Sequence, residues 1–177
     1  MYGARGTTVA LCAMALAGSS LVSAPPSQAG TGLSVVCAGP ESTTYSPGLT
    51  LLPRPAEITA RSAYTCTGLA GGPVKASGFT KGVSAGASCA AVNAPQVKES
   101  VRYADGRKSV ISYTSSWAVR VGGVNVVVLK GRVIEGFAEG AVADRSVQLL
   151  PAELPTACLT SRGVRSAAGA GELHIRT

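Results

Sequence analysis

The stretch SVISYTSSWAVR, Ser109–Arg120, decides the fold class. Four of its apolar side chains share one parity: Ile111, Tyr113, Trp117 and Val119. Serine, threonine and arginine occupy the other parity. This alternation, with its β-branched and aromatic residues, is typical of a strand with one buried face. We therefore predict a strand that places those four side chains in the core. Trp117 could instead stack on a sugar, but the area it would bury favours the core.

The same pattern continues on both sides of this stretch. Gly122–Gly123 is a hairpin turn signal, and Val124–Leu129 is apolar on both faces, as in a central strand. The glycine-rich run that follows predicts bends, with Phe137 turned inward. No segment from Leu33 onward sustains a helical period. About eight short strands with glycine-rich turns predict an antiparallel β-sandwich, immunoglobulin-like in general architecture.

The first residues of the chain predict a secretory leader. Arg5 precedes the apolar run Val9–Leu16, and Ser27–Ala29 offers small residues to a signal peptidase. Cleavage after Ala29 leaves one predicted domain, residues 30–177. Cleavage at an earlier position and an uncleaved anchor are the alternatives, although the apolar run is shorter than the roughly 20 residues of a membrane span. We expect a secreted, extracellular protein that does not span a membrane.

Beyond the leader the chain keeps an even number of cysteines: Cys37, Cys66, Cys89 and Cys158. An even count in an exported chain indicates disulfides, and four cysteines allow about three connectivities. Because strands adjacent in sequence tend to be neighbours in space, we favour Cys37–Cys66 and Cys89–Cys158. A metal site would need closely spaced cysteine or histidine pairs, which this sequence lacks. We expect no metal and no cofactor.

The segment YSPGLTLLPRP, Tyr45–Pro55, contains three prolines and a Pro-Gly pair. Pro47 and Gly48 fit the central positions of a type II turn, in which glycine accepts a positive φ. The leucines at positions 49, 51 and 52 are predicted to anchor the segment in the core. A polyproline ligand for a partner is the alternative, and the leucines favour the structural interpretation.

Several of these features together resemble a set of small secreted proteins of actinobacteria of unknown function. They are VVCAGPESTTYSPGLTLLPRP with Cys37 and Pro47-Gly48, YTCTG at 64–68, Cys89 in ASC, Trp117, and GRVIEGFAEG. The likeness extends over residues 30–177. It implies export from a Gram-positive cell and an all-β fold, and it carries no activity to transfer.

One motif suggests catalysis. GVSAG, Gly82–Gly86, matches the G-x-S-x-G nucleophile elbow with Ser84 as the nucleophile, and His174 is the only histidine. The elbow requires a strand-to-helix turn on a parallel sheet. Here the motif lies in a glycine- and serine-rich stretch that we predict to be a loop before a strand. We therefore expect no enzyme, and an esterase that uses Ser84 is the least favoured interpretation.

The charge of the chain allows a negatively charged partner. The formal net charge is +7, which outside a cell suits an anionic cell-wall polymer, anionic lipid headgroups or acidic glycans. A secreted protein is the other candidate partner. The basic residues are scattered, and no aromatic residues alternate with them as nucleic-acid binding requires. We predict a non-catalytic surface or ligand-binding module. The second interpretation is a hydrolase inhibitor that presents Gly71–Ser88 as an exposed loop.

Overall fold

The computed structural model describes residues 32–92, 96–121 and 124–177, and the side chains of 119–121 lie outside the description. The predicted leader, residues 1–29, lies outside the described residues. The secondary-structure elements, in chain order, are β1 (Ser34–Leu49), β2 (Arg54–Thr67), β3 (Val74–Ala87), β4 (Gln96–Tyr103), β5 (Lys108–Val121), β6 (Val124–Gly136), β7 (Val142–Pro151), the short 3-10 helix η1 (Pro155–Leu159) and β8 (Val164–Arg176). No helix in the described part is long and apolar enough to cross a membrane.

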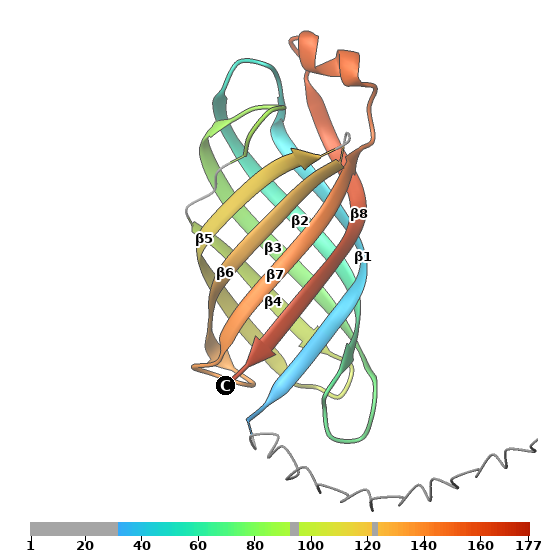
Figure 1. The fold of residues 1–177 in the computed structure, drawn as a ribbon, viewed down its shortest axis with the longest axis vertical. Helices are drawn as coiled ribbons and strands as arrows, with labels where there is room; N and C mark the ends of the chain where they lie inside the picture. Colours follow the sequence, from blue (N-terminus) through green and yellow to red (C-terminus); the bar gives the residue numbers. More distant parts are fainter. Residues whose placement is uncertain (1–31, 93–95, 122–123) are drawn as a thin grey trace, which may run out of the picture. The chain divides into compact units, whose positions relative to one another are not determined.

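These strands form one closed barrel in which each strand pairs antiparallel with its neighbours in sequence (Figure 1). Closure comes from β1 and β8, where Val35 lies opposite Ile175 and Cys37 opposite Leu173. The all-β prediction is confirmed, but the sheet closes on itself and is not shown to be the two-layered, immunoglobulin-like sandwich that we expected. Glycines permit the tight curvature. A Cβ on Gly169, for example, would collide with the carbonyl oxygen of Gln148 on the neighbouring strand.

Apolar side chains fill the end of the barrel that lies away from η1. Fully buried residues there are Val35, Ile111, Val133, Leu173 and Ile175. Phe137 packs edge-on against Tyr103, with ring centroids 5.7 Å apart, and the Arg107 guanidinium lies 4.3 Å from the Phe137 ring centre. The predicted core positions of Ile111 and Tyr113 are confirmed, and Phe137 packs against the core while partly exposed.

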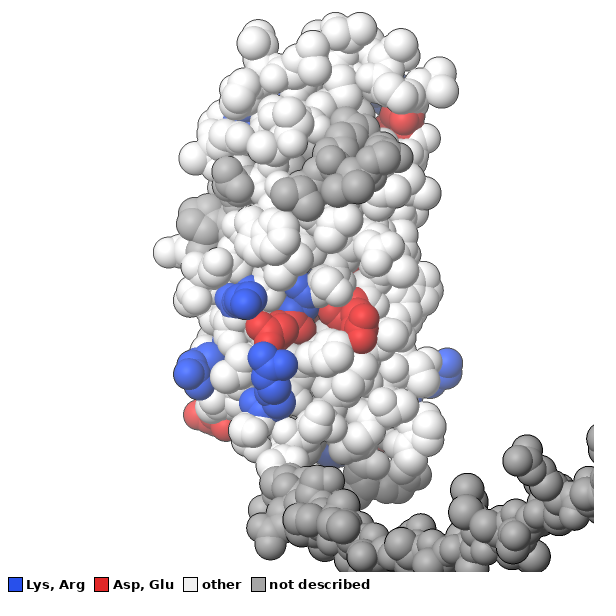
Figure 2. All heavy atoms as spheres, viewed as in Figure 1, with Lys and Arg blue, Asp and Glu red and all other residues white. Residues whose placement is uncertain are grey.

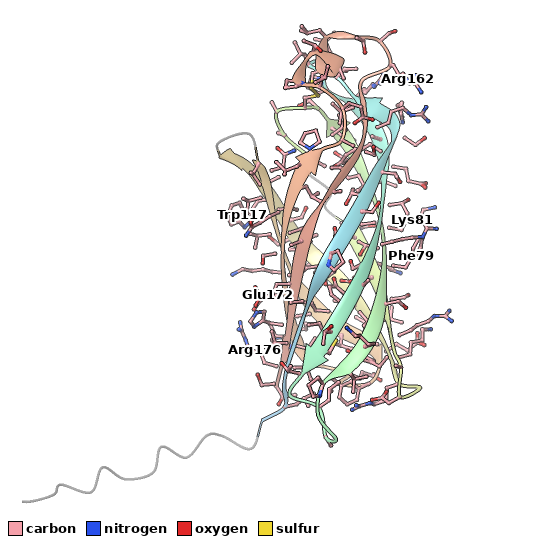
Figure 3. All side chains as sticks on the ribbon, turned by 90° about the vertical axis from the view of Figure 1, so that its right-hand side faces the viewer. Phe79, Lys81, Trp117, Arg162, Glu172 and Arg176 are labelled. Atoms are coloured by element: carbon pink, nitrogen blue, oxygen red, sulfur yellow. A yellow bond between two sulfur atoms is a disulfide. The ribbon has the colours of Figure 1, made fainter. Side chains whose placement is uncertain are left out.

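The prediction for Trp117 is wrong. This side chain is 47% exposed and projects from the outer surface of β5 (Figure 3). The cause is a register shift between Tyr113 and Ser115, which places one extra residue in β5 relative to β6. A bulge of this kind reverses which parity faces inward, so Trp117 faces out although Tyr113 faces in. The side chain of Val119 lies outside the described residues.

The Pro47–Gly48 turn is also corrected. Both residues belong to the end of β1, the Ser46–Pro47 peptide is cis, and Gly48 does not have a positive φ. The register of β1 against β8 shifts in this region, between Thr44 and Leu49. Glycine is needed at position 48 for space, because a Cβ there would collide with the carbonyl oxygen of Arg162.

The leucines of this segment divide into two groups. Leu49 is buried, as predicted, but Leu51 and Leu52 are 55% and 78% exposed. They lie in the short connection between β1 and β2, where the chain reverses at the end of the barrel and points side chains away from it.

Both predicted disulfides are confirmed. Cys37–Cys66 joins directly opposed residues of β1 and β2, and Cys89–Cys158 joins the segment after β3 to η1. Two disulfides are compatible with an extracellular protein.

Candidate functional site

A buried arginine lies in the middle of the barrel. Arg145 projects inward from β7 and is only 2% exposed. Its guanidinium forms ion pairs with Glu41 of β1 and with Glu99 of β4, whose Oε2 lies 3.4 Å from Nη1. Both carboxylates are buried as well. Charges taken out of water are costly unless they are paired and hydrogen-bonded, so this cluster indicates a strongly organised interior.

Hydroxyl groups from other strands complete the network. Glu99 accepts hydrogen bonds from the Tyr113 hydroxyl at 2.6 Å and from the Tyr64 hydroxyl at 3.0 Å. Glu41 accepts one from Ser62 Oγ at 2.9 Å, and Arg145 Nη1 donates to Thr80 Oγ1 at 2.7 Å. The network therefore connects β1, β2, β3, β4, β5 and β7 across the interior.

The charge states of the network follow from these contacts. Burial raises the pKa of Tyr64 and of Tyr113, and the nearby Glu99 raises both further, so the phenols stay protonated and donate. Burial alone would lower the pKa of Arg145, but the Glu99 and Glu41 carboxylates outweigh it and hold that pKa above its ordinary value. Arg145 therefore remains a cation.

A cavity of about 90 Å³ lies between this network and the η1 end of the barrel. Glu41, Thr80 and Arg145 line its polar floor. Its walls are mostly apolar and include Tyr45, Leu49, Ile58, Val97, Val127, Val147, Leu149 and Val164. Cys89 and Cys158 line it too, so the second disulfide lies at the η1 end of the cavity.

The cavity is long relative to its volume. Four successive inward-facing positions of β7 line it, from Arg145 to Pro151. At about 3.3 Å per residue they extend over about 20 Å of strand, or about 15 Å along the axis of a barrel whose strands tilt by about 40°. A volume of about 90 Å³ over that length leaves a narrow shaft.

Two buried polar atoms in the described part lack a hydrogen-bond partner, Arg145 Nε and Ser84 Oγ. A buried donor without an acceptor costs about 1–3 kcal/mol, and more when it is charged. Arg145 lines the cavity floor, whereas its Nε atom is itself closed off from solvent.

The residues proposed for catalysis are not brought together. Ser84 faces the barrel interior and is fully buried, whereas His174 lies on the outer surface of β8, where its ring contacts Glu172 at 2.6 Å. The wall of the barrel separates the two side chains. In the described ranges, no three His, Cys, Asp or Glu side chains are placed to hold a metal ion.

The loop expected at Gly71–Ser88 is mostly the strand β3. Its inward positions hold small residues because the interior is crowded: a Cβ on Gly78 would lie 2.7 Å from Glu99 Oε1, and one on Gly82 would lie 2.9 Å from Val97 Cγ2. Large and charged residues such as Phe79 and Lys81 point outward instead (Figure 3). The exposed inhibitory loop is therefore not present there.

The buried network was not predicted from the sequence. The available signal was parity: Arg145 lies on the same parity of its strand as Val147 and Leu149, both of which are buried. An arginine on the apolar face of an alternating strand indicates a buried charge, and buried charges require partners. Glu99 shows the same signal between Val97 and Val101.

Tyr45 gives the cavity wall a measurable pH dependence. Burial, with smaller contributions from Glu41 and Glu153, raises the pKa of Tyr45 to about 12. In the unfolded chain the Tyr45 phenol loses its proton near pH ~10. The contribution of the protonated phenol to the free energy of unfolding is therefore complete below that pH and is lost as the pH rises to about 12. Between pH ~8 and pH ~11 the free energy of unfolding of Tyr45→Phe should therefore fall by about 1 kcal/mol less than that of the wild type. Urea unfolding of both proteins at the two pH values measures the difference, and equal losses would contradict the assignment.

No family model, no curated protein and no solved structure matches this chain.

Proposed function

We propose that this protein is an exported, non-catalytic β-barrel that binds a small, mostly apolar ligand in its interior. The observation that carries the proposal is the shaft between η1 and Arg145, which has apolar walls and a polar floor formed by Glu41, Thr80 and Arg145. Apolar cavities with a few convergent polar groups are the usual form of ligand sites. The two cysteines of the second disulfide, Cys89 and Cys158, line this end of the shaft.

The dimensions of the shaft favour a slender ligand. Typical ligand pockets measure about 300–1,000 Å³, several times the volume found here. A single unbranched hydrocarbon chain fits a narrow apolar shaft, whereas a fused ring system does not. Its head group would lie against the polar floor formed by Glu41, Thr80 and Arg145. Because Glu41 lines the same floor, an uncharged head such as a hydroxyl avoids repulsion between two carboxylates.

Export is supported by the leader-like segment 1–29 and by the two disulfides, which persist in oxidising compartments. The resemblance to small secreted actinobacterial proteins agrees with it. The non-catalytic assignment is supported by the separation of Ser84 from His174 across the barrel wall.

Filling the shaft with a larger side chain tests the proposal. Val127 lines the cavity, so Val127→Phe should occupy it and weaken binding of n-decanol at least tenfold in isothermal titration calorimetry. The matched control is Val126→Phe on the same strand, because Val126 is not a lining residue. Rigid adamantanol should bind neither variant nor the wild type.

Two results would contradict the proposal: no heat of n-decanol binding to the wild-type protein, or equal binding by both phenylalanine variants. Thermal unfolding of each variant, recorded in parallel, shows whether a loss of binding comes with a loss of folding.

A further inference from the structure

Four leucines project into solvent at the η1 end of the barrel. Leu51 and Leu52 lie between β1 and β2 and are 55% and 78% exposed, while Leu154 and Leu159, beside and at the end of η1, are 76% and 72% exposed. We call these four residues the leucine cluster. Large apolar side chains grouped on a surface mark an interaction site more often than isolated ones do.

The two segments that carry the leucine cluster are held against each other. The Leu51 N–H donates to the carbonyl oxygen of Cys158 at 3.1 Å, and the Cys89 N–H donates to that of Thr50 at 2.8 Å. Leu51, Leu52 and Leu159 line one shallow surface depression. The Cys89–Cys158 disulfide attaches η1 to the segment that follows β3. The exposed side chains are therefore presented by a braced scaffold.

The charge around the leucine cluster is mainly positive. Arg54, Arg162 and Arg165 lie on the segments that form this end, with Glu153 as the acidic residue among them. Arg162 points outward at this end of the molecule (Figure 3). Glu153 is already engaged, since it accepts hydrogen bonds from the backbone N–H groups of Arg165 and Ser166.

The face of the barrel seen in Figure 2 shows a different arrangement. Lys, Arg, Asp and Glu side chains there gather towards the end away from η1, with both signs close together. Ion pairs on the outer wall include Lys81–Glu57 at 3.2 Å and Arg176–Asp144. The leucine cluster lies on other segments, which carry Arg54, Arg162 and Arg165.

We propose that the η1 end docks onto an anionic lipid surface, with the leucine cluster entering the headgroup region and Arg162 and Arg165 contacting the charged heads. Binding at the surface of an anionic membrane requires apolar and basic side chains on the same face of a protein. This docking is independent of the interior shaft and extends beyond the proposed function.

Co-sedimentation with vesicles tests the docking. The purified protein should pellet with vesicles of phosphatidylglycerol and phosphatidylcholine and only weakly with phosphatidylcholine alone, and high salt should release it. The variant Leu52→Ser/Leu154→Ser/Leu159→Ser should bind at least tenfold more weakly, as should Arg162→Ser/Arg165→Ser. The matched control is Trp117→Ser/Leu150→Ser, which removes comparably exposed apolar side chains from the barrel wall.

Retention of binding by the leucine variant, or no binding of the wild type to anionic vesicles, would overturn the proposal. Concentration-dependent self-association that the leucine variant abolishes, without vesicle binding, would assign the cluster to a contact between copies of the chain and would also overturn it. Val127→Phe should pellet like the wild type, so failure of the shaft proposal and failure of the docking proposal give different results.

Discussion

Arg145→Met should lower the free energy of unfolding by about 3–5 kcal/mol, the range measured when one partner of a buried ion pair is removed. Glu41 and Glu99 would then remain buried without their cation, although hydroxyls of Ser62, Tyr64 and Tyr113 would still donate to them. Urea unfolding followed by far-UV circular dichroism measures the loss.

A triple variant separates the uncompensated charge from lost packing. Arg145→Met combined with Glu41→Gln and Glu99→Gln removes all three charges. It should recover a large part of the stability lost by Arg145→Met alone, because the free-energy effects of substitutions within one network are not additive. A loss below about 1 kcal/mol for the single variant would mean that water reaches the cluster freely, in contradiction to its burial.

Cys89→Ser combined with Cys158→Ser should cost about 4 kcal/mol. The disulfide closes a segment with a sequence separation of 69 residues, so it restricts the unfolded chain strongly. Both cysteines also line the cavity, so the variant should release bound n-decanol faster than the wild type in stopped-flow competition.

The other disulfide provides the comparison. Cys37–Cys66 has a sequence separation of 29 and should contribute about 3.5 kcal/mol on the same chain-entropy argument. It lies between directly paired strands, so its removal should leave the release rate of n-decanol unchanged. A variant of Cys89 and Cys158 that is as stable as the wild type would contradict the entropic argument.

The strands and disulfides could be predicted from the sequence because their signals are local. The alternation around Ile111 and Tyr113 depends only on neighbouring residues. The even number of cysteines beyond the predicted leader depends only on counting. Closure of the sheet was not predictable in this way. It depends on whether β1 meets β8, which are the first and the last strand in chain order.

Two errors concern Trp117 and the stretch around Gly82–Gly86. In β3 the inward positions are Gly, Ala, Ser and Thr, and the outward ones include Phe79 and Val83, so the sequence lacks an apolar inner face and we predicted a loop instead of a strand. A narrow barrel whose centre holds Arg145 and two carboxylates leaves little room for large side chains there. Trp117 was misplaced by a single extra residue in β5, and no alternation pattern reveals a bulge in advance.

The pairing of β1 with β8 also sets the order in which the chain can fold. Strand β1 can pair with β8 only when the last residues of the chain are available. Pairings so distant in sequence make folding slow. Until then one edge of β1 has free backbone groups that another chain could pair with. A polypeptide threaded through an export channel from its N-terminus would therefore stay loose until its final strand emerged, and a factor that shielded this edge meanwhile would raise the yield of folded protein.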